Sequence, residues 1–424
     1  VVAHFHEWMT GSGGLYLQKY APYTATVFTT HATILGRTLA GNGQPLYSNL
    51  QRFNADDYAR QYNIMAKHSI ERTSANEFDC FATVSDITAR ECQYLLGREV
   101  DIVTPNGFED DFVWKGKEFD AKRKTAKAAM IKVAEACLDY KFEKDPLIVG
   151  TSGRYEFKNK GLDVLMESLK QVAADDTQER DVLAYITVPA GNEGPRKDLQ
   201  AHLADQSKPI DRSLYKHTTH YLSGWDPIVN AMNGSILDTP NSRVKVIFVP
   251  SYLNGDDGIF DLPYYELLVG MDITVFASYY EPWGYTPLES VAFSVPTITT
   301  TLAGFGLWVD LHTKDHEGVK VIERTDTNDQ EVTDRIAALI SNIAQMPAKE
   351  FAELLKNAAD TSKIVLWEKL IAYHRSAYSI AYDNAGSSTN KVVYEGGGAH
   401  LGHVKSYRQQ LFANIPTWTP LLFE

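Results

Sequence analysis

The chain has 424 residues, 44% of them hydrophobic and 22% charged, which is the composition of a globular protein long enough for two or three domains. Its formal net charge of -13 argues against broad binding of nucleic acids, because phosphate contacts need clustered Lys and Arg. It contains three cysteines without metal-type spacing and no apolar run of about 18 residues, so we expect a cytoplasmic protein without disulfides, zinc or a membrane span.

The first predicted element is a strand-like run over residues 1–5, and a His-x-His-Glu segment overlaps its end. Because the chain starts within this run and without Met, we expect earlier residues to be missing. His4 and His6 invite a metal site, but we expect their side chains to point to opposite faces of the extended segment, and no third ligand is evident. We therefore expect no metal, one histidine facing a ligand at the strand end, and the other buried with a structural partner.

Short apolar runs alternate with helical stretches along the rest of the chain. This alternation predicts an α/β protein in which parallel sheets carry helices on both faces. The predicted strands are residues 26–30, 80–84, 100–104, 147–151, 183–188, 244–249, 273–277 and 297–300.

The spacing of these strands predicts two domains and a C-terminal segment. Residues 118–144 are rich in Lys, Glu and Ala and indicate a helical connector, whereas residues 191–242 lack apolar periodicity and indicate an insertion. Helix resumes from about residue 347 to 384. We predict an N-terminal domain over 1–133, a C-terminal domain over 134–365, and a segment over 366–424 that crosses back to the N-terminal domain.

A cluster of charged residues follows the predicted strand at 147–151. It reads Gly-Arg-Tyr-Glu-Phe-Lys-Asn-Lys-Gly over residues 153–161, and a helix is predicted after it. Arg154 offers a planar fork and Lys160 a point charge, and together they would stabilise the negative charge of a leaving pyrophosphate. Two basic residues on a loop are usually only solvated, so this interpretation depends on the motif that follows.

The most specific motif is Ser-Tyr-Tyr-Glu-Pro-Trp-Gly-Tyr-Thr-Pro-Leu-Glu over residues 278–289. Glu281 is expected just beyond the carboxyl end of the strand at 273–277, where open α/β sheets bind ligands, and Glu289 on the next helix, facing the same crevice. Two isolated glutamates would more often belong to a solvated turn. The free N–H groups at the helix start favour phosphate or sugar oxygens, and they belong to Trp283, Gly284, Tyr285 and Thr286.

Two glycine-rich segments carry weaker signals. Residues 11–14, Gly-Ser-Gly-Gly, lack the lysine and the spacing of a phosphate-binding loop, and we interpret them as a turn. Residues 300–306 follow a predicted strand and could expose N–H groups to a phosphate. An ordinary tight turn remains the alternative for the second segment.

Together these segments resemble the fungal and animal type of glycogen synthase, a family of retaining glycosyltransferases with the GT-B fold. The resemblance runs from residue 1 to about 380, and residues 279–287 are its most specific part. It implies two Rossmann-like parallel-sheet domains facing an interdomain cleft, with roughly the first half of the N-terminal domain upstream of residue 1. The other segments that carry it are residues 4–8, 28–37, 84–88, 103–107, 153–161, 248–256, 261–266 and 299–306.

The resemblance implies a glycogen (starch) synthase that moves glucose from UDP-glucose to the non-reducing end of an α-1,4-glucan and releases UDP. Glu281 matches the family's active-site glutamate beside the transferred glucose, and His6 matches a histidine near the glucosyl group. Arg154 and Lys160 match the pair that holds the donor diphosphate. No metal and no cofactor would be needed.

The same resemblance assigns the residues that bind the donor. Glu289 matches the glutamate that binds the ribose. Tyr252 and Tyr264 match two aromatic residues that sandwich the uracil, as flat rings can do by stacking. The loop under the glucose and the phosphates would consist of Trp283, Gly284, Tyr285 and Thr286.

Two departures from the family pattern concern its regulation and assembly. The insertion at 191–242 is smaller than the helices that form tetramers in eukaryotic members. The helix around residues 350–366 lacks the arginine-rich run that binds the activator glucose 6-phosphate and offers only Lys349, Lys356 and Lys363. Both departures suit a bacterial member. The expected partners are UDP-glucose and glycogen or another α-glucan; no nucleic acid and no membrane are expected, and a homo-oligomer is compatible with the sequence.

Two other functions stay open at this stage. An ADP-glucose-dependent glucan synthase is one, because stacking aromatic rings do not separate uracil from adenine. An inactive glucan-binding fragment is the other, because part of the N-terminal domain is expected upstream of residue 1. A carbohydrate phosphorylase is disfavoured, since no segment marks a lysine that carries a cofactor.

Overall fold

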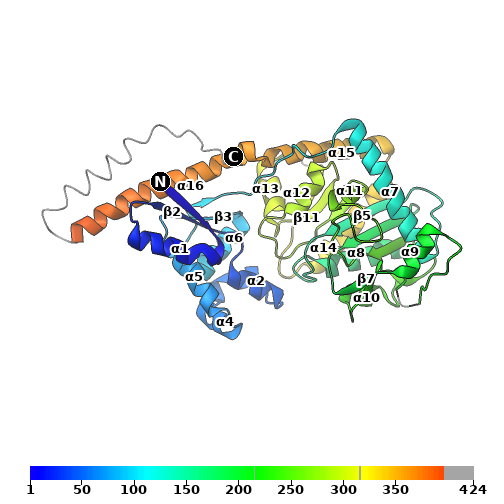
Figure 1. Ribbon diagram of the computed structural model, residues 1–424, viewed down its shortest axis with the longest axis horizontal. Helices are drawn as coiled ribbons and strands as arrows, with labels where there is room; N and C mark the ends of the chain where they lie inside the picture. The colour runs from blue at the N-terminus through cyan, green and yellow to red at the C-terminus, as the bar shows by residue number, and fades with distance from the viewer. Residues whose placement is uncertain (214, 315–316, 396–424) are drawn as a thin grey trace.

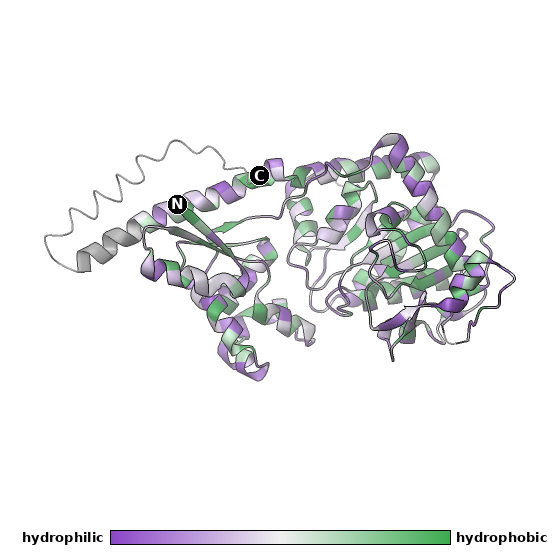
Figure 2. Ribbon diagram, viewed as in Figure 1, coloured by the Kyte–Doolittle hydropathy of each residue, from purple (hydrophilic) through white to green (hydrophobic). Residues whose placement is uncertain are grey.

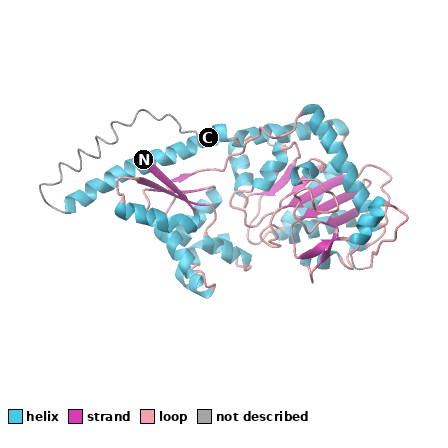
Figure 3. Cartoon of the chain, in the orientation of Figure 1, coloured by secondary structure: helices cyan, strands magenta, loops and turns pink. Residues whose placement is uncertain are grey.

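The computed structural model describes residues 1–213, 215–314 and 317–395 and shows two lobes, each built on a parallel sheet (Figure 1, Figure 3). Every strand predicted between residues 26 and 300 overlaps an observed one, which confirms the α/β class of parallel sheets and helices. A long helix, α16 (Trp367–Glu395), starts beside the C-terminal lobe and runs along the N-terminal one.

The N-terminal sheet has four parallel strands in the order β1-β2-β3-β4, and both of its faces are apolar. Phe28 and Phe81 pack with Phe78 on one face, while Ala25 and Val27 contact alanines of α16 on the other, because alternate strand residues point to opposite faces. The elements of this lobe are β1 (Val2–His6), α1 (Glu7–Tyr20), β2 (Ala25–Thr30), α2 (Ile34–Gly41), α3 (Leu46–Asn49), α4 (Ala55–Gln61), α5 (Met65–Glu77), β3 (Cys80–Thr83), α6 (Asp86–Glu91) and β4 (Ile102–Val103).

The interpretation of residues 11–14 as a turn is wrong, because they lie inside helix α1. A Cβ atom at Gly11 would come within 2.2 Å of the Ser74 Oγ atom, and one at Gly14 within 2.0 Å of the Phe78 Cζ atom. The glycines therefore allow α1 to pack closely against α5 and the residue that follows it.

The C-terminal sheet has six parallel strands in the order β12-β11-β10-β5-β6-β9. From β5 the chain builds outward in one direction through β6 and β9, and then returns to the other side of β5 with β10. The strands are β5 (Leu147–Ser152), β6 (Val182–Thr187), β9 (Val244–Phe248), β10 (Ile273–Val275), β11 (Thr297–Thr300) and β12 (Val319–Ile322).

Helices cover both faces of the C-terminal sheet, whose strands form the hydrophobic centre of this lobe (Figure 2). One face packs against α7 (Gly116–Leu138), and the other against α8 (Leu162–Ala174) and α14 (Asp329–Ala344). Buried Asp272 forms ion pairs with Arg123 and Lys127, so the first half of α7 also belongs to this layer. The predicted domain boundary after residue 133 falls within this helix. The other helices of this sheet are α11 (Tyr264–Leu268), α12 (Tyr285–Ala292) and α13 (Gly304–His312).

Residues 191–242 form a small unit of their own beside the sheet. Its two antiparallel strands are β7 and β8, and the guanidinium of fully buried Arg196 holds it together. Arg196 donates to the backbone oxygen of Tyr215 at 2.6 Å and pairs with Asp198 at 2.7 Å. Its elements are β7 (Asn192–Pro195), α9 (Lys197–Ala204), β8 (His220–Leu222) and α10 (Pro227–Met232).

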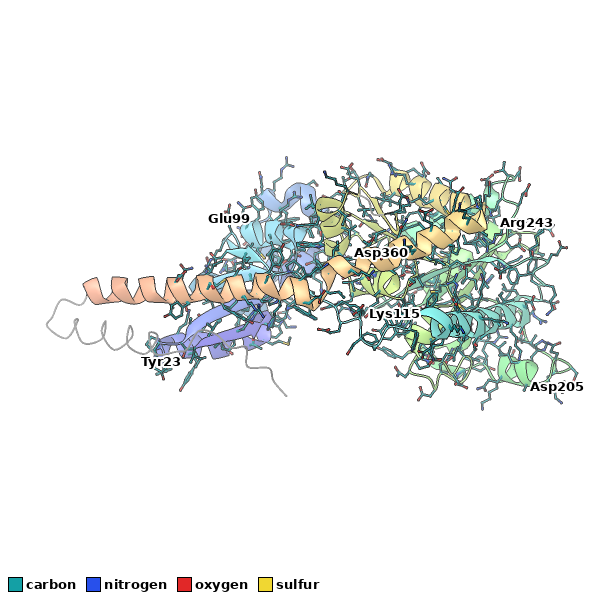
Figure 4. The ribbon with its side chains drawn as sticks, turned by 90° about the horizontal axis from the view of Figure 1, so that it is seen from above. Tyr23, Glu99, Lys115, Asp205, Arg243 and Asp360 are labelled. Atoms are coloured by element: carbon teal, nitrogen blue, oxygen red, sulfur yellow. The ribbon has the colours of Figure 1, made fainter. Side chains whose placement is uncertain are left out.

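The chain returns to the N-terminal lobe after α15 (Ala348–Ser362). The backbone of Phe108 pairs with the residues on both sides of Leu366, and the Asn384 amide of α16 donates to the Asp79 carbonyl at 2.8 Å. Seen from above, α16 lies across the N-terminal lobe (Figure 4). The rest of the predicted segment, residues 396–424, lies outside the described residues. Among the helices that the structure describes, none is long and apolar enough to cross a membrane.

Candidate functional site

The candidate site lies at the carboxyl ends of β5 and β10, where the strand order reverses direction. At such a switch point the loops of two neighbouring strands leave the sheet on opposite sides, and open α/β sheets bind ligands in the crevice between them. The loop after β5 is the predicted charged segment 153–161, and the loop after β10 carries the predicted glutamate motif. The topology therefore brings the two most specific sequence motifs together.

Backbone contacts join these two loops. The N–H groups of Tyr279 and Tyr280 both donate to the Asn159 carbonyl, at 2.9 and 3.0 Å. Gly161 has a φ of 66°, and a Cβ atom there would come within 1.6 Å of the Ala277 carbonyl oxygen. Only glycine suits both this backbone conformation and this close approach, so the sequence fixes the contact between the loops.

Lys160 and Glu281 form an ion pair between the two loops, and their side chains are only 15% and 14% exposed. Arg154 is placed differently, because its side chain is 64% exposed and lies 3.5 Å from the carboxylate of Glu156. The structure thus brings Lys160 and Glu281 into direct contact and leaves Arg154 at the rim. A shielded cation beside a carboxylate can hold a phosphate on one side and a polarised sugar on the other.

The turn after Glu281 leads directly into α12. Gly284 has a φ of 104° and precedes the helix, so the N–H groups of Tyr285 and Thr286 belong to its first turn. Trp283 is buried, and its indole N–H finds no partner among the described residues. All four residues predicted for this loop therefore lie beside Glu281.

The predicted phosphate-facing amides of residues 300–306 are engaged elsewhere. The N–H of Gly304 donates to the Glu281 carbonyl at 2.9 Å, and the N–H of Phe305 donates to the Trp283 carbonyl at 2.7 Å. These bonds hold the glutamate loop in place from below. These two amides therefore support the glutamate loop and are not free to bind a phosphate.

The residues predicted to bind the nucleoside are less tightly grouped. Glu289 on α12 accepts a hydrogen bond from the Tyr265 hydroxyl at 3.0 Å, and burial raises its pKa. The Tyr264 N–H donates to the Leu253 carbonyl, which puts Tyr264 close to Tyr252 along one loop. However, the Tyr252 ring is 72% exposed, whereas the Tyr264 hydroxyl lies 2.6 Å from the Ser152 hydroxyl beneath the loop.

Histidines gather at the carboxyl ends of β1 and β2 in the N-terminal lobe. The rings of His4 and His6 lie 4.1 Å apart between centroids, so the expectation that they point to opposite faces is wrong. Residues two apart in a strand share a face. His6 is exposed, and its Nδ1 atom lies 2.9 Å from the Nε2 atom of His31. His4 is more buried and lies 2.8 Å from the Thr29 hydroxyl.

His31 is a site residue to which the sequence interpretation gave no role. Its backbone N–H donates to the Glu7 carboxylate at 2.7 Å, and Glu7 itself has a φ of 67°. Burial lowers the pKa of His31 to about 4 and of His4 to about 3, and it also lowers the pKa of His6. These rings are therefore neutral at pH 7 and offer hydrogen bonds without charge. A signal was available, because His31 directly follows β2, just as His6 directly follows the strand-like run predicted over residues 1–5.

The strand ends of the two lobes meet near Glu281. Gly304 lies so close to Ser85, which follows β3, that a Cβ atom there would come within 2.7 Å of the Ser85 Cβ atom. The Tyr280 hydroxyl reaches the carboxylate of Glu91 on α6 at 2.9 Å. Within the described residues no group of His, Cys, Asp and Glu is arranged to hold a metal ion.

Comparisons with known proteins agree with this arrangement. A family model described as Glycogen synthase matches residues 1–206 and 210–395. Glycogen [starch] synthases of Caenorhabditis elegans and Neurospora crassa are both 29% identical to the chain, over 94% and 91% of its length. The liver enzyme of Homo sapiens is 28% identical over 91% of the chain. The chain spans 68%, 63% and 63% of these relatives, respectively.

Solved structures support the fold alone. The catalytic domain of starch synthase IV from Arabidopsis thaliana superposes with a TM-score of 0.52 at 14% identity, over 90% of this chain and 73% of that one. The N-terminal domain of a trehalose-6-phosphate phosphatase from Candida albicans gives 0.55 at 13% identity, over 89% and 70%. The two parallel-sheet lobes therefore have the GT-B arrangement of glycosyltransferases.

Proposed function

The chain belongs to the glycogen synthase family, and from that premise we propose that it transfers glucose from UDP-glucose to the non-reducing end of an α-1,4-glucan, with retention of configuration and release of UDP. One observation carries the proposal. The shielded ion pair of Lys160 and Glu281 lies at the switch point of the C-terminal sheet, beside the first turn of a helix. A nucleotide-sugar site needs such a combination of cation, carboxylate and free N–H groups.

In the proposed reaction the bond from the anomeric carbon to the β-phosphate oxygen breaks, and its electron pair leaves with UDP. The acceptor hydroxyl forms the new bond on the same face of the sugar, and its proton passes to the departing phosphate. Lys160 and Arg154 would stabilise the developing charge on UDP, and Glu281 would orient the glucose and stabilise positive charge at its anomeric carbon. No cofactor and no metal takes part in this scheme.

The neutral histidines would form hydrogen bonds with the sugar. His6 and His31 lie within hydrogen-bond distance of each other, so each ring keeps its second nitrogen for another partner. Neutral donors and acceptors suit the hydroxyl groups of glucose. Glu289, Tyr252 and Tyr264 would bind the uridine.

Several finer points belong to the same proposal. The protein would act in the cytoplasm, where glycogen is built, and it can act as a homo-oligomer. Its curated relatives named above are eukaryotic, and a bacterial origin of this chain stays a prediction based on its short insertion and its helix without clustered arginines.

The test is a donor panel with glycogen as the acceptor, using the full-length protein. We expect release of UDP from UDP-glucose, incorporation of glucose into α-1,4 linkages, and lower catalytic efficiency with ADP-glucose. Higher efficiency with ADP-glucose would favour the ADP-glucose-dependent alternative. Binding of glycogen without transfer from either donor would favour the inactive glucan-binding alternative.

A further inference from the structure

Two neighbouring tyrosines, Tyr279 and Tyr280, connect the lobes immediately before Glu281. They belong to the C-terminal lobe, yet both pack into a hydrophobic cluster formed by residues 32–64 and Leu95 of the N-terminal lobe. Tyr280 is only 2% exposed there. Glu281 therefore follows directly after a segment that is inserted into the other lobe.

The Tyr280 hydroxyl has a specific partner in that cluster. It donates to the Glu91 carboxylate at 2.9 Å, and the Thr33 hydroxyl donates to the same oxygen at 2.7 Å. Glu91 is 1% exposed, so water cannot replace a lost donor without opening the interface. Leaving a buried carboxylate without one of its hydrogen bonds costs free energy. The contact therefore favours the relative position of the lobes in which the bond forms.

The Tyr279 hydroxyl makes a second, independent connection. It donates to Asp326 of the C-terminal lobe at 2.6 Å and accepts from the Leu46 N–H at 2.9 Å. Asp326 in turn accepts from the N–H and the hydroxyl of Ser48, at 2.6 and 2.5 Å. Two adjacent side chains thus reach two different hydrogen-bond networks across the interface.

The backbone of the same dipeptide holds the donor loop. Both tyrosine N–H groups donate to the carbonyl of Asn159, which directly precedes Lys160. A shift of the tyrosines relative to the N-terminal lobe would therefore move Lys160 and Glu281 together relative to the histidines of that lobe.

We propose that Tyr280 and Glu91, supported by Tyr279 and Asp326, form a latch that positions the Lys160–Glu281 pair against the N-terminal lobe. These four residues act through others and are positioning residues. The latch rests on the proposed glucosyl transfer, because its purpose is to align groups that a donor and an acceptor contact from different lobes. A misplacement of about 1 Å between such groups can cost on the order of a hundredfold in rate.

The first experiment separates turnover from donor binding. Tyr280→Phe removes one hydroxyl, and we expect kcat to fall about tenfold while the affinity for UDP, held by the C-terminal lobe, stays within twofold. Glu91→Leu removes the same contact together with the bond from Thr33, so its kcat should fall at least as far, and the double variant should be no worse than Glu91→Leu alone. Glu91→Gln keeps an acceptor for the hydroxyl and should lose less, which gives a test should Tyr280→Phe not fold.

The matched control is Tyr140→Phe. The Tyr140 hydroxyl also donates to a carboxylate at 2.9 Å, that of Asp181, but both residues lie within the C-terminal lobe. Its kcat should stay within twofold of wild type. The latch is overturned if Tyr280→Phe and Glu91→Leu behave like this control.

A second experiment measures the relative position of the two lobes directly. Glu99 and Asp205 are exposed and lie on different lobes, at well-separated places (Figure 4), and the three native cysteines are buried. Glu99→Cys and Asp205→Cys therefore allow two fluorophores to be attached. Tyr280→Phe should broaden the distribution of energy-transfer efficiencies, and Tyr140→Phe should not; identical distributions would reject the latch. If the wild-type protein transfers no glucose, the proposed function fails, and this distribution alone decides on the latch.

Discussion

The strand ends of the two sheets carry opposite kinds of polar group. In the N-terminal lobe the histidines there are neutral, since burial lowers the pKa of His31 to about 4, and on α5 beneath the same loop burial raises the pKa of Glu71 to about 8. In the C-terminal lobe the polar groups are charged, with Lys160 paired to Glu281 and Arg154 exposed at the rim. The candidate site thus has a neutral half and a charged half.

This difference follows from how each lobe solvates its polar groups. Glu71 is fully buried and accepts hydrogen bonds from the Thr30 hydroxyl at 2.5 Å and from the Ile34 N–H at 3.0 Å, with no cation among the groups that shift its pKa. A carboxyl group in such surroundings favours its protonated form. The loop of Lys160 instead pairs each charge with an opposite one. The neutral half suits a glucan, whose hydroxyl groups carry no charge, and the charged half suits a diphosphate.

The largest expected effect comes from removing the negative charge of the charged half. Glu281→Gln should reduce glucosyl transfer by on the order of a hundredfold or more, because a preorganised electrostatic group beside the reacting carbon is lost. Affinity for UDP should be unchanged or slightly higher, since Lys160 loses the carboxylate that competes for its charge. Rates and UDP calorimetry measure both. Transfer within a few-fold of wild type would remove Glu281 from the site.

The effects of replacing the cations should follow the order of their burial, with the least exposed cation contributing most. Lys160→Ala should weaken UDP binding and turnover by about tenfold or more, and Arg154→Ala by less, because Lys160 is 15% exposed and Arg154 is 64% exposed. Lys158→Ala is the matched control. It lies on the same loop, is 68% exposed, and pairs with Asp163 at 2.6 Å.

Calorimetry of UDP binding at low and moderate salt tests this order. The Lys158 variant should bind UDP like the wild type. Equal losses for all three variants would indicate a general effect of surface charge and would contradict a specific diphosphate site.

The charged half was largely predictable from sequence, because its signal is local. After β5 a glycine and then charged residues follow, and after β10 the glutamate motif follows within six residues, so the residues that share the switch point are visible as two short motifs. Strand β12, Val-Lys-Val-Ile, was not predicted, although it is as long as the predicted strand β11.

The neutral half was not predictable in the same way, because it depends on tertiary contacts. The glycines of α1 are explained by Ser74 and Phe78, and no local rule requires them. Tyr280 and Glu91 are 189 residues apart in sequence and meet only because two lobes pack together. Burial that holds a histidine neutral is likewise invisible in a single sequence.

The neutral half also predicts a particular dependence of stability on pH. The folded state keeps Glu71 protonated up to about pH 8, whereas the unfolded chain releases this proton near pH 4.5. The stabilising contribution is therefore complete below pH 4.5 and is lost as the pH rises to 8. The Glu71→Gln variant has no ionisable group at this position, so its free energy of unfolding should not show this fall between pH 4.5 and 8.

Denaturant unfolding of wild type and variant at several pH values measures the difference. Relative to the variant, the free energy of unfolding of the wild type should fall by up to about 1.4 kcal/mol per pH unit between pH 4.5 and 8. The difference between the two proteins should level off outside this window. Glu77→Gln is the control, because Glu77 lies at the exposed end of the same helix. Parallel curves for wild type and Glu71→Gln would show that the carboxyl group is ionised in the folded protein.

The smallest expected effect concerns a second site for a dianion, away from the diphosphate site proposed around Lys160 and Arg154. In helix α15 the side chains of Lys349 and Lys356 are exposed, and Lys363 beyond it pairs with Asp360 at 2.6 Å, which lowers the pKa of that carboxyl group. An effector changes activity only through different affinities for two states, and two separate lysines offer little to a phosphate dianion. Millimolar glucose 6-phosphate should therefore leave the rate at sub-saturating UDP-glucose unchanged. The rival cluster is a surface pocket around Arg335 that also contains Lys314 and Lys320, where Lys320 pairs with Glu317. A several-fold activation that survives Lys356→Ala and is lost in Arg335→Ala would place an effector site there and would show that positive charge in the C-terminal lobe serves a purpose besides holding the donor.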